Sequence, residues 1–314
     1  PLAMTEKPGW VSATCLFNRL QSRGGLLMID CRSKEAHALG HIAFAINLPE
    51  QSPEVTVEAL VGGLDEAQAT WFRRLCTNEI ILYSHDTEST WVHRLAGLLG
   101  EGSPKKVGIL AISYAEFQQR YPFLNCTEEN FSDPTEMGLS YPNEIIEGLL
   151  FLGNFKDSQN PKVLSDLGIT HVINASNVLV EYVKKEGVEY FEVPIPDDDQ
   201  AKMHPFFADA VKFVTAAQRA GGRVLIHCKV GISRSATLTI CTVMHLNKWH
   251  LRKAFRHVAR CREIICPSQT FREQLLAEEK RLFGKCSVVP EELNWLGPNI
   301  SEEPPRQPRG CLVM

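Results

Sequence analysis

The sequence predicts two α/β domains, and three observations support this prediction. The chain has 314 residues, a length typical of two domains. Hydrophobic residues make up 44% of it and charged residues 22%, which are values of a globular protein. Short apolar runs typical of buried strands alternate with segments of helical character, and such alternation favours mostly parallel sheets. Asn, Glu, Ser, Asp and Pro gather at 125–140, so we expect a linker there between domains at 1–124 and 141–284.

In the front domain, two apolar runs predict buried strands at Leu26–Asp30 and Asn78–Tyr83. Helices are expected at Trp71–Cys76 and Trp91–Leu99, and a turn with a short strand at 40–49. The second domain repeats the alternation. Its expected elements are strands at Leu149–Gly153, Ile169–Asn174 and Val188–Pro194, and helices at Pro161–Leu167, Phe206–Ala220 and Ser235–Trp249. The helix Ser235–Trp249 is apolar nearly all round, which predicts burial.

The segment Val224–Ser235 is the most informative part of the sequence. An apolar strand runs into Cys228, Arg234 follows, and a helix then begins. A strand, a loop and a helix N-terminus direct several backbone N–H groups to one spot, and these groups stabilise an anion. A thiol placed there loses its proton readily and becomes a nucleophile, while an arginine can bind two phosphate oxygens. The segment therefore predicts a phosphate-binding loop with a nucleophile at its floor.

The residues from His227 to Ala236 resemble the Cys-x5-Arg signature of the protein tyrosine phosphatase superfamily, most closely its dual-specificity branch. The resemblance spans 141–284 and implies a phosphocysteine intermediate on Cys228, with no metal and no cofactor. It also implies a general acid at Asp197, with Asp198 as the alternative, and a hydroxyl at Ser235 that assists release of the thiolate. The implied phosphate-binding residues are Lys229, Val230, Gly231, Ile232, Ser233 and Arg234, with His227 bracing the loop.

Two features depart from that pattern or add to it. Ser268 stands where the family usually has asparagine, which weakens the expected support of the loop. A basic stretch, expected on one helix, predicts either a solvated face or attraction of an anionic substrate, whether a phosphorylated loop or an acidic membrane. Its residues are Arg252, Lys253, Arg256, Arg260 and Arg262.

The front domain resembles the rhodanese domain over 10–124, through the segments 29–33, 40–42 and 45–49. A working rhodanese has a sulfur-accepting cysteine after the strand that ends here at Tyr83, and this chain has Ser84. Serine holds no persulfide, so we expect a non-catalytic domain and disfavour sulfurtransferase activity. Cys31 is expected to be a small packed residue rather than a reagent.

Both domains together resemble the mitogen-activated protein kinase phosphatases and, most closely, the serine/threonine/tyrosine-interacting-like proteins. Known members of the second group lack the nucleophilic cysteine, whereas Cys228 is present here. The first group docks kinases through a basic cluster, and the comparable segment 50–58 is acidic here. We expect an active dual-specificity phosphatase acting on phosphorylated proteins in kinase signalling, with mitogen-activated protein kinases as candidate partners. The alternative is a weakly active or inactive phosphoprotein-binding scaffold.

Composition excludes several other classes. A net charge of -4 and a pI near 6.2 give no overall nucleic-acid footprint. The ten cysteines are scattered, without a C-x-x-C pair, and the histidines lack metal-ligand spacing, so we expect reduced thiols in the cytoplasm and no metal. The tail at 285–314 has a disordered composition and ends Cys311-Leu-Val-Met, a prenylation box. One lipid supports at most weak membrane association.

Overall fold

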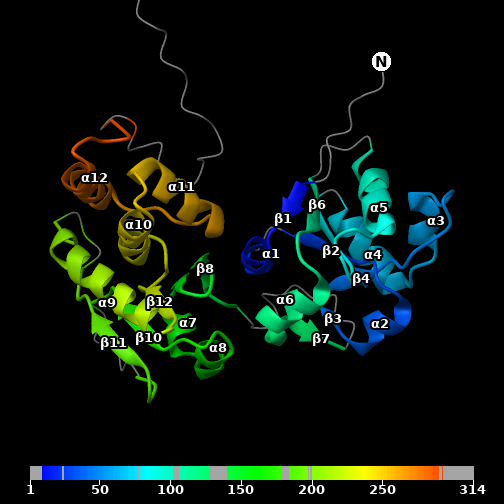
Figure 1. Ribbon diagram of the computed structural model, residues 1–314, viewed down its shortest axis with the longest axis horizontal. Helices are drawn as coiled ribbons and strands as arrows, with labels where there is room; N and C mark the ends of the chain where they lie inside the picture. The colour runs from blue at the N-terminus through cyan, green and yellow to red at the C-terminus, as the bar shows by residue number, and fades with distance from the viewer. Residues whose placement is uncertain are drawn as a thin grey trace, which may run out of the picture. The chain divides into compact units, whose positions relative to one another are not determined.

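The structure is a computed structural model that describes residues 9–22, 25–76, 78–101, 106–127, 140–177, 184–196, 198, 200–289 and 292. The chain divides into two compact units, Pro1–Ser140 and Tyr141–Met314 (Figure 1). Both units are α/β, as the sequence predicts. Cys311 and Asp197 lie outside the described residues.

The first unit is built on a five-stranded parallel sheet with the strand order β1-β6-β5-β2-β4. Its strands are β1 (Gly9–Val11), β2 (Leu26–Asp30), β3 (His41–Ile42), β4 (Ala45–Asn47), β5 (Glu79–Tyr83), β6 (Val107–Leu110) and β7 (Asn125–Cys126), with β3 and β7 forming a separate antiparallel pair. Its helices are α1 (Ala13–Leu20), α2 (Lys34–Leu39), α3 (Val57–Gly62), α4 (Glu66–Leu75), α5 (Thr90–Gly100), α6 (Tyr114–Arg120) and the 3-10 turn η1 (Pro122–Leu124).

The second unit has a five-stranded sheet with the order β11-β10-β12-β9-β8, in which only β8 is antiparallel. Its strands are β8 (Asn143–Ile146), β9 (Leu150–Gly153), β10 (His171–Asn174), β11 (Glu189–Glu192) and β12 (Val224–His227). Its helices are α7 (Phe155–Gln159), α8 (Pro161–Asp166), the 3-10 turn η2 (His204–Phe206), α9 (Phe207–Arg219), α10 (Arg234–Asn247), α11 (Leu251–Cys261) and α12 (Gln269–Phe283).

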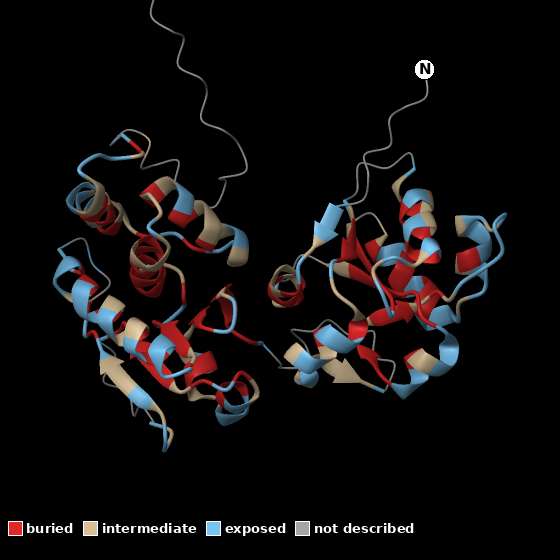
Figure 2. Ribbon diagram, in the orientation of Figure 1, coloured by how far each residue is buried: buried red, intermediate tan, exposed pale blue. Residues whose placement is uncertain are grey.

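Helix α10 forms the centre of the second unit. It packs against β12 and β9 and is surrounded by α9, α11 and α12 (Figure 1). Every residue from Arg234 to Met244 is buried, which Figure 2 shows as a helix coloured red along most of its length. The predicted all-round burial of this helix is confirmed. The basic stretch is placed differently from the prediction, because α11 ends at Cys261 and Arg262 lies beyond it.

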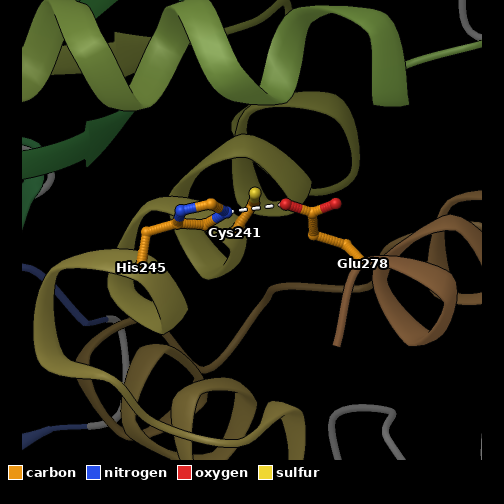
Figure 3. A group of neighbouring side chains, drawn as sticks. All are labelled: Cys241, His245 and Glu278. Atoms are coloured by element: carbon orange, nitrogen blue, oxygen red, sulfur yellow. Dashed lines mark hydrogen bonds and ion pairs between the residues drawn. The ribbon is translucent and has the colours of Figure 1, made fainter. Parts of the chain in front are cut away.

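A polar cluster joins α10 to α12 within this core (Figure 3). Cys241 and His245 lie one turn apart on α10, and Glu278 faces them from α12. The Nε2 atom of His245 lies 2.7 Å from Oε1 of Glu278, and the guanidinium of Arg281 donates to both oxygens of the same carboxylate. These hydrogen bonds satisfy the buried carboxylate, and the one with His245 links α10 to α12.

Candidate active site

The floor of the site is Cys228, which directly follows β12. This strand lies between β10 and β9, so the thiol emerges at the carboxyl edge of a central parallel strand. Cys228 is only 3% exposed and packs within the main apolar core of the unit. Burial in the core fixes the position of Cys228, and its sulfur faces the loop.

Hydrogen bonds to the sulfur define its charge state. The backbone N–H of Gly231 donates to Sγ at 3.2 Å, and the hydroxyl of Ser235 donates at 3.1 Å. Burial by itself would raise the pKa of Cys228, but donation from Ser235 and from the backbone N–H groups of Gly231 and Val230 brings that pKa below its usual range. The geometry therefore favours the thiolate, the nucleophilic form.

The loop adopts a shape that only glycine allows at one position. Gly231 has φ +79°, and a Cβ atom added there would lie 2.5 Å from the carbonyl oxygen of Gly153. The next carbonyl, of Ile232, accepts a hydrogen bond from the N–H of Cys266 at 2.9 Å. The loop is thus held from two sides, by β9 and by the segment that precedes α12.

Arg234 begins α10 and is 3% exposed. Its Nη1 donates to the carbonyl of Ile195 at 3.0 Å, two residues before the expected acid Asp197. The cation thus lies beside both the loop and the segment that leads to Asp197. Asp198, the alternative acid, is exposed, and its Oδ1 accepts from the N–H of Gln200 at 2.9 Å.

The remaining predicted residues surround this centre. His227 is fully buried on β12, and burial lowers its pKa to about 4, so the ring is neutral. Lys229 and Val230 are exposed at the rim, and the carbonyl of Lys229 accepts from the N–H of Phe155 at 3.3 Å. Ser233 accepts at its hydroxyl from the N–H of Ser268 at 3.3 Å. The backbone of Ser268 therefore reaches the loop although its side chain caps α12.

Arg262 is a residue of this site that the sequence placed wrongly. It was expected on the basic helix, but its Nε donates to the carbonyl of Gly231 at 2.9 Å and its Nη1 to Oδ1 of Asn143 at 2.7 Å. Burial lowers the pKa of Arg262, and the nearby Asp157 and Cys228 oppose that effect. Burial also raises the pKa of Asp157 to about 6. One feature of the sequence could have indicated this placement, because Arg262 lies just past the end of the apolar periodicity of α11.

The first unit also has a buried cysteine after an inner strand of its sheet. Cys31 follows β2, and burial together with the neighbouring Asp30 raises its pKa well above the usual range. Ser84, at the end of β5, is 9% exposed, and its carbonyl accepts from the N–H of Tyr114 at 3.0 Å. The thiol of Cys31 therefore keeps its proton, and Ser84 stands in place of a cysteine. Neither of these two positions supplies a sulfur nucleophile.

Metal-ligating side chains gather, within the described residues, at Cys241, His245 and Glu278, whose ligand atoms lie within 4.8 Å of one another. Glu278 is already bonded by His245 and Arg281, so hydrogen bonding accounts for the cluster. Cys241 and His245 lie toward the middle and end of α10, seven and eleven residues after Arg234, which begins that helix. Hydrolysis through a cysteine nucleophile needs no metal.

Comparisons with known proteins agree with both units. The dual specificity phosphatase catalytic domain family matches residues 150–281, and the rhodanese-like domain family matches residues 14–120. The chain is 28% identical to dual specificity protein phosphatase 4 of Gallus gallus, over 87% of this chain and 81% of that protein. It is also 28% identical to dual specificity protein phosphatase 1 of Homo sapiens, over 83% of this chain and 80% of that protein.

Among solved structures, the human tyrosine phosphatase-like serine/threonine/tyrosine-interacting protein is 30% identical over 46% of this chain and 99% of that chain, with a TM-score of 0.43. The two family matches fall on the two compact units, one on each. The chain therefore carries a rhodanese-like domain at 14–120, followed in sequence by a dual specificity phosphatase catalytic domain at 150–281.

Proposed function

We propose that Cys228 is the nucleophile that hydrolyses phosphotyrosine, phosphoserine and phosphothreonine in proteins. The observation that carries this proposal is the donation of two hydrogen bonds to its sulfur, from Gly231 and Ser235, together with the lowered pKa of the thiol. The sulfur attacks phosphorus, the bond to the leaving oxygen breaks, and a phosphocysteine forms. Water then attacks phosphorus and restores the thiolate, with Ser235 donating to the departing sulfur.

Arg234 and the backbone N–H groups of 229–234 would hold the three non-bridging phosphate oxygens as charge spreads over them. The hydrogen bond from Arg234 to the carbonyl of Ile195 supports this role, because it places the guanidinium beside the segment that leads to Asp197. Asp197 would protonate the leaving oxygen and then accept a proton from water. The neutral, buried His227 would brace the loop rather than transfer protons.

The test uses an aryl phosphate at mildly acidic to neutral pH in the presence of a chelator. We expect Cys228→Ser to lose at least about 10³-fold in rate, because the nucleophile is gone, while Cys31→Ser keeps the wild-type rate. Asp197→Ala should lose about 10²-fold or more on poor leaving groups and less on good ones. A wild-type rate no higher than that of Cys228→Ser would overturn the proposal and favour the scaffold alternative.

We propose mitogen-activated protein kinases as one class of phosphoprotein substrate, with a role in kinase signalling in the cytoplasm. The relatives named as dual specificity phosphatases 1 and 4 support a protein substrate. The acidic segment 50–58 argues against docking through a basic cluster in the rhodanese-like domain. The test removes residues 1–124 and compares the rates on a small substrate and on a phosphorylated kinase. We expect the rate on the small substrate to stay unchanged. A loss of rate on the kinase alone would show that this domain docks the kinase through residues other than a basic cluster.

We also propose that Cys311 is prenylated, since the residues 311–314 match a Cys-aliphatic-aliphatic-Met box. A single lipid next to Glu302 and Glu303 would support only weak, reversible membrane association. Intact mass of the protein from eukaryotic cells decides the question, because an unmodified terminal Met314 excludes prenylation.

A further inference from the structure

A hollow of about 630 Å³ lies along α11 of the phosphatase unit. It is bounded by the turn before α11 and by the segment after α12. Five cations line it, Arg252, Lys253, Arg256, Arg260 and Lys285, together with two histidines. None of the described residues that line it is an aspartate or glutamate. A concave surface with one sign of charge concentrates ligands of the opposite sign.

Most of this positive charge is available to a ligand. Arg252 is the exception, because it donates to Glu292 and to the carbonyl of Ser287. Lys253 is exposed and lies 4.0 Å above the ring of Trp249. Within the described part of the chain, Arg256, Arg260 and Lys285 have no ion-pair partner. Cations that serve only to stabilise the fold would be paired with carboxylates. The charge of these three residues therefore favours binding of an external anion.

Three of the cations lie in a row along α11. Lys253, Arg256 and Arg260 are three and four residues apart, so they share one face of α11. At a rise of about 1.5 Å per residue, this face extends roughly 10 Å along the helix. Arg260 lies two residues before Arg262, which contacts the catalytic loop at Gly231. Of the two ends of the basic face, the one at Arg260 is therefore the nearer along the chain to the contact between Arg262 and the loop that holds Cys228.

We propose that this hollow binds an acidic segment of the phosphoprotein substrate, on one side of the residue that is hydrolysed. The proposal rests on the proposed function of Cys228. An extended peptide advances about 3.3 Å per residue, so a face of roughly 10 Å matches about three successive residues, and substitutions at positions two to six from the phosphorylated residue sample it. Carboxylates or a second phosphate would satisfy the cations. A concave site fits a peptide better than a flat bilayer, and the net charge of -4 disfavours nucleic acid.

The experiment compares two phosphotyrosyl peptides that differ only in having Glu or Gln at those positions. The test variant is Lys253→Gln/Arg256→Gln/Arg260→Gln. The matched control is Lys212→Gln/Arg219→Gln/Lys280→Gln, which removes three exposed cations outside the hollow. Wild type and control should prefer the Glu peptide by about ten-fold in kcat/KM, mainly through KM, and the preference should weaken with salt. The test variant should lose that preference while its rate on an aryl phosphate stays unchanged.

An equal preference in the test variant and the control would overturn the proposal. Binding of the two peptides to Cys228→Ser protein, followed by fluorescence anisotropy, separates this failure from a failure of the proposed function. Preferential binding of the Glu peptide that depends on the three cations supports the hollow even if turnover is absent. Binding of phosphatidylserine vesicles or single-stranded DNA that depends on the same cations, without discrimination between the peptides, would overturn it in favour of those ligands.

Discussion

Two buried cysteines of this protein each follow an inner strand of a sheet, yet their pKa values are shifted in opposite directions. Cys31 follows β2, which lies next to the edge strand β4, and Cys228 follows the middle strand β12; they are 5% and 3% exposed. Burial raises the pKa of both thiols. Donors around Cys228 reverse that effect, whereas Asp30 beside Cys31 adds to it. The charge state of a buried thiol is therefore decided by its immediate donors and not by its place in the fold.

The largest effect should come from removing the carboxylate beside Cys31. Asp30 is fully buried and accepts hydrogen bonds from Arg32 at 2.6 Å and from His37 at 2.8 Å. Asp30→Asn leaves the buried guanidinium without its counter-charge, and we expect a loss of about 3–5 kcal/mol in the unfolding free energy of the first unit. Urea unfolding of the full chain measures it, with the exposed Glu88→Gln as the control. A loss below about 1 kcal/mol would show that the ion pair is structurally unimportant.

A second effect should come from blocking the loop shape at Gly231. An added Cβ would approach the carbonyl oxygen of Gly153 to 2.5 Å, so Gly231→Ala must move the N–H that donates to Cys228. A misplacement of that kind predicts a fall of about 10²-fold in kcat/KM. Gly148→Ala is the control, because Gly148 also has a positive φ, +66°, but its added Cβ meets no atom within 4 Å. Equal activity in the two variants would contradict the importance of the loop shape.

A smaller effect should follow from removing one donor to the thiolate. Ser235→Ala deletes the hydroxyl hydrogen bond, so the pKa of Cys228 rises and less thiolate is present at acidic pH. We expect alkylation of Cys228 by iodoacetamide near pH 6 to slow about ten-fold, and the acid limb of the activity profile to move to higher pH. Thr239→Val, which removes a buried hydroxyl without a partner among the described residues, is the control. In native protein Cys31 should stay unlabelled at this pH.

Much of the secondary structure could be predicted from the sequence, because apolar runs indicate directly which segments are buried. The strand at Leu26–Asp30 has the predicted bounds, and the helix expected at Ser235–Trp249 is α10, found at Arg234–Asn247. Short elements such as α3 lacked a clear periodic signal and were not predicted. The helix expected at Phe206–Ala220 is α9, found at Phe207–Arg219, and the 3-10 turn η2, which contains Pro205, directly precedes it.

The site was predictable where it is local in sequence and not where it depends on distant segments. Cys228, Gly231 and Ser235 lie within eight residues, and the latter two donate to the sulfur of Cys228. The link between Arg262 and Gly231 joins residues 31 positions apart, and that between Arg262 and Asn143 joins residues 119 apart. No spacing rule reports such pairs, because they depend on how α11 and β8 pack in three dimensions.

The burial of α10 limits how this enzyme can diversify. Its first eleven residues have no solvent-facing position, and the same helix sets the geometry of Arg234 and Ser235. A substitution along it therefore changes core packing and the reactive centre together, and selection for new substrates has little freedom there. The exposed rim is different, since Val230 of the loop is 51% exposed, as is Ile264, two residues before Cys266, which contacts the loop. New specificities should arise by variation at such rim positions, while α10 changes slowly.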